Sequence, residues 1–392
     1  MLSTAVQAFF GFFFWVINAR LFTTEEVGIA TTLISVMALI GTFSSFGLNI
    51  GLIRFLPSTK KRNELITASF IISTLTSSIF VAIFIFGLPI LSPKLEFLRH
   101  NLFYIFTFAL FIILFACNII IESIFTSKRA SQFTLIKNTI LSVIKVLMPI
   151  PLALFGSYGI FMSVGIANGI ALIFSFFILI TIYKLRISLN VNISLLKPIA
   201  KYSFGNYIAS FTSNLPLMVM PIIITNNISP SHSGFFYIDM MIINLLLIIP
   251  SAASQSLLAE GSHEEQNFRH YLQRTVILTV LFLVPIIVLI ILFGNYILLV
   301  FGKSFSVEGY TLLRLFALST IFTSINILLN VVLNIQKRIN TIIFISFIGP
   351  LILIILTYTF ISQGLIGIGI AWLIGEAIIS LLYLILVFKR HK

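Results

Sequence analysis

The chain alternates long apolar stretches with short polar connections along its whole length. We read twelve stretches of roughly 20 apolar residues each, the length that a helix needs to cross a bilayer. Their limits are 4–22, 28–50, 64–91, 101–124, 133–155, 159–182, 201–225, 233–257, 275–300, 310–333, 340–361 and 364–388. The first hinge, 23–28 (TTEEVG), places a threonine before two acids and a glycine, a signal for the start of a helix. The pattern predicts an all-α, polytopic membrane protein.

Composition excludes a water-soluble globule. The chain is 59% hydrophobic and 9% charged, whereas soluble domains contain about 25% charged residues. The single cysteine, Cys117, lies within an apolar stretch, so we expect a buried structural residue, no disulfide within the chain and no metal site. The first stretch is not a signal peptide, because it lacks a basic start and a cleavage site of small residues.

The positive charge is distributed unevenly between the two sides of the predicted membrane. The connections after the even-numbered spans, together with the carboxyl tail, hold 18 of the 24 lysines and arginines, and the other side holds 5. Basic residues concentrate on the cytoplasmic side of membrane proteins. We therefore expect both termini to be cytoplasmic, and the net charge of +13 needs no nucleic-acid partner.

An internal repeat divides the sequence into two halves. Three anchors recur in order: 23–28 in 229–234, 127–129 in 336–338, and Gly159 with 165–167 in Gly364 with 369–371. The offsets lie between 204 and 209 residues. Because each half holds six spans, the halves have the same orientation, which predicts a parallel repeat with bundles at 1–190 and 191–392.

Polar side chains form stripes inside several spans. Each stripe has two interpretations: a seam of interhelical hydrogen bonds, or the wall of a hydrated cavity. For stripes that recur in both halves we favour a shared cavity. The candidate cavity residues are Asn18, Asn214, Asn326 and Asn330.

Charged residues inside the spans are few. Glu122 and Lys137 flank the turn at 128–129 at similar distances, which predicts an ion pair across the hairpin, with a functional role as the alternative. Asp239 and Glu376 are candidates to carry a coupling proton or Na⁺, with salt bridging or a position at a wet helix end as the alternatives.

Prolines and missing motifs narrow the mechanism further. Pro216 and Pro221 in the seventh span predict either the bending element of a gate or a static kink. The sequence has no phosphate-binding lysine loop, no metalloprotease motif and no nucleophile elbow. We therefore expect no resident cofactor.

Three basic residues raise the question of an anionic substrate. Arg20 lies near the end of the first span, Arg54 near the end of the second, and Lys145 inside the fifth. Such residues either extend to the membrane surface or line a wet cavity.

Several motifs resemble those of polysaccharide flippases. The stretch 19–28 (ARLFTTEEVG) resembles their first-hinge signature ARLLGPEEFG, and 46–55 (FGLNIGLIRF) resembles their LGLSTALIRF segment. Residues 250–258 (PSAASQSLL) and the YG and GIA patterns of the sixth and twelfth spans also fit. The chain thus resembles the Wzx-type branch of the multidrug/oligosaccharidyl-lipid/polysaccharide (MOP) exporter superfamily.

The resemblance implies a V-shaped protein of two six-helix bundles that rocks between inward-open and outward-open states. The implied substrate is a polyprenyl-diphosphate-linked oligosaccharide, whose headgroup crosses through a central cationic cavity while its lipid tail stays in the bilayer. Arg20 and Arg54 match basic positions of the family and would attract the diphosphate, and Lys145 is added on charge alone. The implied partners are this substrate and membrane lipids, and we expect a monomer in the cytoplasmic membrane.

Two other functions remain open at this point. A multidrug cation exporter of the same superfamily would need acidic residues deep in its cavity, yet the spans carry more basic than acidic charge at depth. A membrane-embedded polysaccharide polymerase or ligase generally needs a sizeable outer loop, and the predicted outer connections are short.

Overall fold

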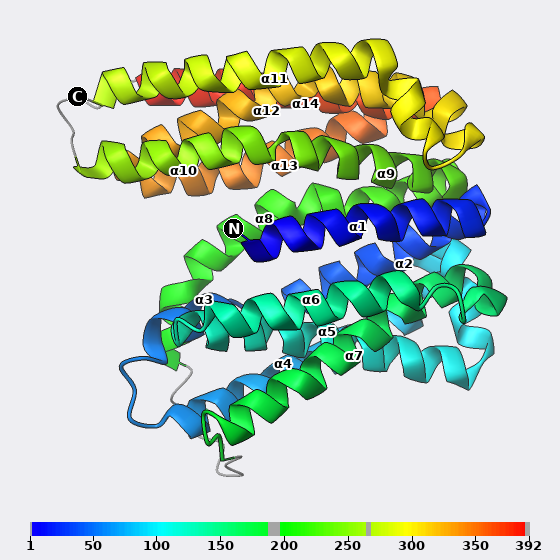
Figure 1. The fold of residues 1–392 in the computed structure, drawn as a ribbon, viewed down its shortest axis with the longest axis vertical. Helices are drawn as coiled ribbons and strands as arrows, with labels where there is room; N and C mark the ends of the chain where they lie inside the picture. The colour runs from blue at the N-terminus through cyan, green and yellow to red at the C-terminus, as the bar shows by residue number, and fades with distance from the viewer. Residues whose placement is uncertain (1, 187–196, 264–267, 389–392) are drawn as a thin grey trace. The chain divides into compact units, whose positions relative to one another are not determined.

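The computed structural model describes residues 2–186, 197–263 and 268–388, and every regular element within these ranges is a helix (Figure 1). The chain forms two compact units. Unit 1 comprises Met1–Phe211 and Leu217–Gly234, and unit 2 comprises Thr212–Pro216 and Phe235–Lys392. The repeat boundary between residues 190 and 191 stays a prediction.

Unit 1 is built on a run of helices from the amino end. Its elements are α1 (Leu2–Leu21), α2 (Thr24–Phe43), α3 (Leu48–Phe55), α4 (Arg62–Leu91), η1 (Pro93–His100), α5 (Leu102–Ser127), α6 (Ser131–Leu147), η2 (Ala153–Phe155), α7 (Gly156–Thr181) and most of α8 (Lys197–Asn227). Both α5 and α6 pack along α7. Buried apolar side chains from α3, α4, α5 and α7 form its core, among them Leu52, Ile66, Ile121 and Leu179.

Unit 2 repeats this architecture. Its elements are α9 (Pro230–Leu246), α10 (Ile248–His263), α11 (Phe268–Leu299), η5 (Phe305–Gly309), α12 (Tyr310–Ile335), α13 (Ile339–Phe360), η6 (Ile361–Gln363) and α14 (Gly364–Phe388). The helices α12 and α14 pack along each other, and α13 packs on α14. The first residues of α9 belong to unit 1, and a short stretch of α8 belongs to unit 2.

Apolar side chains on the outside of the helices identify a multi-pass membrane protein. In α11 the buried residues form one stripe that includes Thr279, Leu283 and Ile287, while Ile277 and Leu281 are exposed. A helix that is apolar all round, with one packed stripe, suits a lipid environment. Ten stretches of the described residues are long and apolar enough to cross a membrane. The stretch 339–388 holds both α13 and α14, and the 17-residue α6 is not among the ten, so the count of twelve spans stays a prediction.

The predicted cap at the first hinge is confirmed. The Thr23 hydroxyl accepts a hydrogen bond from the Glu26 backbone N–H at 3.2 Å, and the Glu26 carboxylate accepts one from the Thr23 N–H at 2.9 Å. This reciprocal capping box starts α2 and fixes the direction in which the chain leaves α1.

The second predicted span, 28–50, is interrupted, because α2 ends at Phe43 and α3 begins at Leu48. Gly47 has a φ of 77°, a left-handed conformation that favours glycine. The helix end is stable because other elements satisfy its carbonyls: the Tyr207 hydroxyl donates to Phe43 O at 2.9 Å, and the Thr76 hydroxyl donates to Ser44 O at 2.8 Å. Arg54 consequently lies in a separate short helix.

The structural repeat has a constant register of 208 residues from α5 and α12 onward. The ends of α5 (102, 127) recur at the ends of α12 (310, 335), and η2 at 153–155 recurs as η6 at 361–363. The left-handed residues Arg129 and Lys337 are also 208 residues apart. The alignment of Gly159 with Gly364 is therefore wrong: Gly364 corresponds to Gly156, which shares its positive φ. The GIA triplets at 165–167 and 369–371 do not occupy corresponding positions, because the two halves share backbone conformation rather than residue identity.

Candidate functional site

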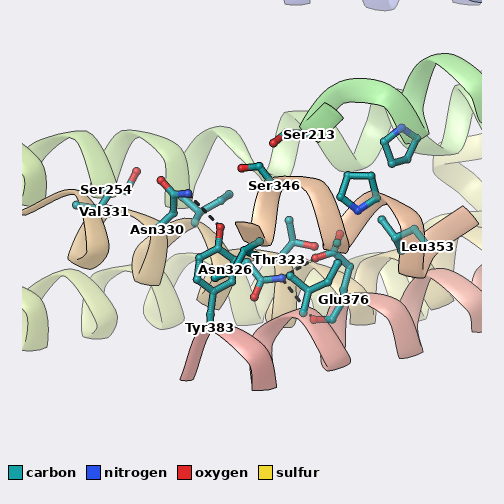
Figure 2. Close-up of a pocket in the computed structure, with 16 residues that line it drawn as sticks. Ser213, Ser254, Thr323, Asn326, Asn330, Val331, Ser346, Leu353, Glu376 and Tyr383 are labelled. Atoms are coloured by element: carbon teal, nitrogen blue, oxygen red, sulfur yellow. Dashed lines mark hydrogen bonds between the residues drawn. The ribbon is translucent and has the colours of Figure 1, made fainter. Parts of the chain in front are cut away.

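A polar cavity lies within unit 2. It has a volume of about 410 Å³ and is lined by side chains of α8, α10, α12, α13 and α14, among them Ser213, Ser254, Asn326, Ser346, Glu376 and Tyr383 (Figure 2). This volume falls in the range of about 300–1,000 Å³ that is usual for small-molecule sites. Every residue of the lining belongs to unit 2.

Among the described residues that line this cavity, Glu376 provides the only carboxyl group. The Asn326 amide donates to Glu376 Oε2 at 2.8 Å, and the Ser380 hydroxyl donates to Asn326 Oδ1 at 2.8 Å. Both Asn326 and Glu376 are at least nine-tenths buried. Figure 2 shows the two side chains directed toward each other from α12 and α14, with Thr323 beside them.

The polar stripe of the predicted tenth span continues along α12. The Asn330 amide donates to the Tyr383 hydroxyl at 3.0 Å, and the Asn334 amide donates to Asn330 Oδ1 at 2.9 Å. The stripe is therefore both an interhelical seam and a cavity wall, so the two interpretations of its sequence coexist. A carboxyl with amide and hydroxyl oxygens around a small space is a ligand set for a proton or a hard monovalent cation.

Asp239 lies elsewhere in unit 2. It is fully buried in α9, and within the described chain neither of its carboxyl oxygens has a hydrogen-bond partner. The backbone of η5 approaches it closely, since a Cβ added to Gly309 would lie 3.3 and 3.4 Å from its two oxygens. Asp239 does not line the cavity that contains Glu376, so the two candidate acids occupy separate places.

The Glu122–Lys137 ion pair is present in unit 1. Lys137 Nζ lies 2.9 Å from Glu122 Oε1, with the lysine side chain 2% exposed and the glutamate 46% exposed. The pair joins α5 to α6 just beyond their turn. In that turn, burial and the nearby Arg62 charge lower the pKa of the Lys128 amine, which lies 4.4 Å from the centre of the Tyr183 ring.

The three candidate cations of unit 1 do not converge on one point. Lys145 Nζ in α6 lies 5.0 Å from the centre of the Phe14 ring in α1, a cation–π arrangement. Arg20 and Arg54 are both exposed, Arg20 at the end of α1 and Arg54 in α3. Between them runs the whole of α2, which at 1.5 Å per residue is about 30 Å long. A single diphosphate therefore cannot contact both guanidinium groups at once.

The remaining candidates occupy different environments. Asn18 is fully buried and donates to Phe14 O at 2.6 Å within its own helix, so protein packing surrounds it. Asn214 is exposed on α8 and does not line the unit 2 cavity. Pro216 lines that cavity, and Pro221 lies further along α8, which is an unbroken helix across both prolines.

Two features were missed at the level of sequence. The first is a contact in unit 1 that repeats Asn326–Glu376: the Asn118 amide donates to Asn168 O at 2.9 Å and to Asn168 Oδ1 at 3.3 Å. The second is a polar cavity at the start of α6. A repeat alignment at 208 residues would have revealed the first, since both contacts join residues 50 positions apart. Across the described residues, no cluster of His, Cys, Asp and Glu could hold a metal ion.

Comparisons with solved structures establish the fold. The chain is similar to the lipid II flippase MurJ in an inward closed conformation, with a TM-score of 0.80 and 17% identity over 99% of this chain and 87% of that one. The chain is also similar to an inward-facing MATE family multidrug resistance transporter of the MOP superfamily, with a TM-score of 0.75 and 12% identity over 97% of this chain and 93% of that one. Its similarity to the MATE multidrug transporter DinF-BH has a TM-score of 0.65 and 15% identity, over 99% of this chain and 95% of that one. The predicted fold class is confirmed, and these neighbours are transporters rather than enzymes.

Sequence comparison assigns the family. No curated protein matches the chain. A family model described as "Polysaccharide biosynthesis protein" matches residues 17–308, from the last turn and a half of α1 to η5. The matched region contains 19–28, 46–55, 250–258 and the pattern of the sixth predicted span, which carried the resemblance to flippases, whereas the pattern of the twelfth predicted span lies beyond it. Because the match covers about three quarters of the chain, this protein belongs to the polysaccharide biosynthesis protein family.

Proposed function

We propose that this protein flips a polyprenyl-diphosphate-linked oligosaccharide from the cytoplasmic to the outer leaflet of a prokaryotic cytoplasmic membrane. It does so by alternating access, makes and breaks no covalent bond, and supplies surface polysaccharide synthesis. The observation that carries the proposal is the family match over residues 17–308, on a fold that a lipid II flippase shares.

The cations of unit 1 would serve the diphosphate in sequence. With both termini cytoplasmic, as the basic residues predict, Arg54 lies toward the cytoplasmic end of α2 and Arg20 toward its outer end. A guanidinium offers paired donors that match two phosphate oxygens. The headgroup would leave Arg54, pass Lys145 and reach Arg20, so that no single site holds it tightly enough to stop transport.

The cavity of unit 2 would serve coupling. Glu376, supported by Asn326, would bind a proton or Na⁺ while the cations of unit 1 handle the substrate. The same carboxyl also supports the rival function, export of cationic drugs, since the fold is shared with multidrug transporters.

Reconstituted flipping tests the proposal directly. Purified protein in liposomes should move a fluorescent lipid-linked oligosaccharide between leaflets, and the gene should restore surface polysaccharide to a flippase-deficient strain. Arg54→Ala should slow flipping at least tenfold, about 1.4 kcal/mol, whereas Arg186→Ala, another exposed arginine of unit 1, should not. Full activity of Arg54→Ala at normal expression would remove that residue from the substrate path.

Drug susceptibility separates the rival function. Expression in an exporter-deficient strain should leave resistance to cationic drugs unchanged, while Glu376→Gln should abolish the dependence of flipping on an ion gradient. Resistance that rises with expression, together with an absence of flipping in liposomes, would assign the protein to drug export instead.

A further inference from the structure

Another polar cavity is lined by described residues of unit 1. It has a volume of about 810 Å³ and is formed by the start of α1, the end of α5 and the start of α6. Its lining includes Ser3, Gln7, Glu122, Arg129, Gln132 and Asn138. None of the three proposed diphosphate contacts, Arg20, Arg54 and Lys145, lines this cavity, so the proposed path of the headgroup leaves it without a role.

Most of the described residues that line this cavity carry hydrogen-bonding groups. Of the thirteen described residues that line it, ten carry a polar or charged side chain, and the apolar members are Leu2, Ala130 and Leu135. Asparagine and glutamine amides both donate and accept, and the hydroxyls of serine and threonine do the same. A lipid tail or an apolar drug would leave these groups unsatisfied, whereas a ligand that carries many hydroxyls would pair with them.

The charges of the cavity nearly cancel. Glu122 is paired with Lys137 at 2.9 Å, which removes its attraction for a cation. Arg129 then leaves a net charge of about one positive unit among the described residues that line the cavity. The electrostatics therefore fit a neutral or weakly acidic ligand.

One residue of the cavity lining carries a buried acceptor that has no partner within the described chain. Asn138 is 4% exposed, and its amide donates to Ser3 Oγ at 2.9 Å. Its Oδ1 atom accepts no hydrogen bond from the described chain. Buried polar atoms nearly always have a partner, so this oxygen is suited to accept a hydrogen bond from a ligand hydroxyl.

We infer that this unit 1 cavity is a saccharide subsite, which binds a sugar of the lipid-linked oligosaccharide while the diphosphate is held elsewhere. The inference rests on the proposed function. The cavity adjoins the basic turn at 128–129, which the charge distribution predicts to be cytoplasmic, the side from which the substrate would enter. Recognition of the sugar here makes transport depend on the glycan as well as on the diphosphate.

A steric plug tests the subsite with little risk to folding. Gln132 lines the cavity and is exposed near the start of α6, so Gln132→Trp should fill the opening without disturbing the core. The matched control is Asn340→Trp, an exposed position 208 residues later in α13 that lines neither cavity. Asn138→Leu is a second variant that removes the unpartnered acceptor.

Two lipids distinguish the subsite from the proposed function as a whole. One is undecaprenyl diphosphate, and the other is the lipid-linked oligosaccharide that accumulates when the gene is deleted from its host. For the full chain in nanodiscs, Gln132→Trp and Asn138→Leu should each weaken binding of the sugar-bearing lipid at least tenfold and change binding of undecaprenyl diphosphate less than twofold. Asn340→Trp should change neither.

Three results would overturn the inference. If Gln132→Trp, folded as judged by its melting temperature, binds the sugar-bearing lipid as tightly as the unchanged protein, the cavity is not a saccharide subsite. If Gln132→Trp weakens the binding of both lipids equally, the cavity serves the diphosphate or the fold rather than the sugar. If the unchanged protein binds neither lipid, the proposed function fails, and the subsite fails with it.

Discussion

The helix pair α5–α7 of unit 1 and the pair α12–α14 of unit 2 share one contact and differ in one side chain. In both, an asparagine amide reaches a residue 50 positions later, at its backbone carbonyl and at its side-chain oxygen. The pairs are Asn118–Asn168 and Asn326–Glu376, and their positions are 208 residues apart. The contact itself is therefore part of the scaffold, because a neutral amide supports it as well as an acid does.

The surroundings explain why only one of the two sites carries an acid. Glu376 borders a cavity with Thr323 beside it, and the Ser380 hydroxyl donates to Asn326, the partner of Glu376. The corresponding positions in unit 1 hold Phe115 and Leu172, which are apolar. The fold does not require a carboxyl at this position, and the adjacent space can admit an ion. These two features support our proposal that Glu376 has a functional role rather than a packing role.

The ion-paired residues beside the turn at 128–129 of unit 1 have no charged counterparts in unit 2. Glu122 and Lys137 form an ion pair in unit 1, and their counterparts in unit 2 are Asn330 and Ile345. Lys145 likewise corresponds to Leu353. At these corresponding positions unit 1 thus carries an ion pair and Lys145 and unit 2 carries Glu376, which fits our proposal that unit 1 serves the anionic substrate and unit 2 serves coupling.

The largest expected effect comes from transferring the acid to unit 1. Asn168→Glu would bury a carboxylate near the middle of α7, where Asn168 is 3% exposed and lines neither cavity. We expect a loss of about 3 kcal/mol in stability, the cost of a charged residue at this depth. The apparent melting temperature in detergent measures the loss.

The reciprocal variant is the control for that transfer. Glu376→Asn gives unit 2 the neutral pair that unit 1 already tolerates, so its melting temperature should change little while ion-dependent flipping is lost. If Asn168→Glu melts like the unchanged protein, unit 1 offers the carboxyl an equivalent solvated space, and the contrast between the two units is wrong.

A smaller difference is expected at the glycines that begin α7 and α14. Gly156 and Gly364 have φ values of 54° and 64° with ψ near −134° and −142°, a region that is nearly restricted to glycine. A Cβ at Gly156 would lie 2.7 Å from Glu26 Oε1, whereas one at Gly364 meets nothing within 4 Å. Glu26 belongs to the capping box of α2, so its displacement should cost Gly156→Ala about 1 kcal/mol more than Gly364→Ala.

Thermal or denaturant unfolding of both alanine variants checks this difference. The strain of the backbone cancels in the comparison, because the two conformations are alike, and only the contact with Glu26 remains. Equal losses in the two variants would mean that the Glu26 side chain moves aside at no cost and that the cap contributes nothing to stability.

The sequence was sufficient for the features that depend on local chemistry. The apolar periodicity predicted the helices, Thr23 and Glu26 predicted the cap, and the spacing about the turn at 128–129 predicted the Glu122–Lys137 pair. Each of these follows from residues close together in the chain, where helical geometry fixes which side chains meet.

Features that depend on distant partners could not be predicted in this way. The break between α2 and α3 is stabilised by hydroxyls of Thr76 and Tyr207, about 30 and 160 residues away. The polar stripe of α12 could be a seam or a cavity wall, and only the positions of Glu376 and Tyr383 on α14 show that it is both. Helical periodicity identifies a polar face but not the element that packs against it.

The smallest expected effect concerns the lower part of the same seam. Tyr383→Phe removes the hydroxyl that accepts from the Asn330 amide at 3.0 Å, and interhelical hydrogen bonds in membranes contribute about 0.6 kcal/mol on average. Its counterpart in unit 1 is Ser175, which donates to Ala171 O of its own helix at 2.7 Å, so Ser175→Ala should change stability less. Paired unfolding measurements of the two variants are the test. A loss in Tyr383→Phe no larger than that in Ser175→Ala would mean that the seam of unit 2 holds the cavity open without strengthening the fold, and the stabilising role would then belong to Asn326 and Glu376 alone.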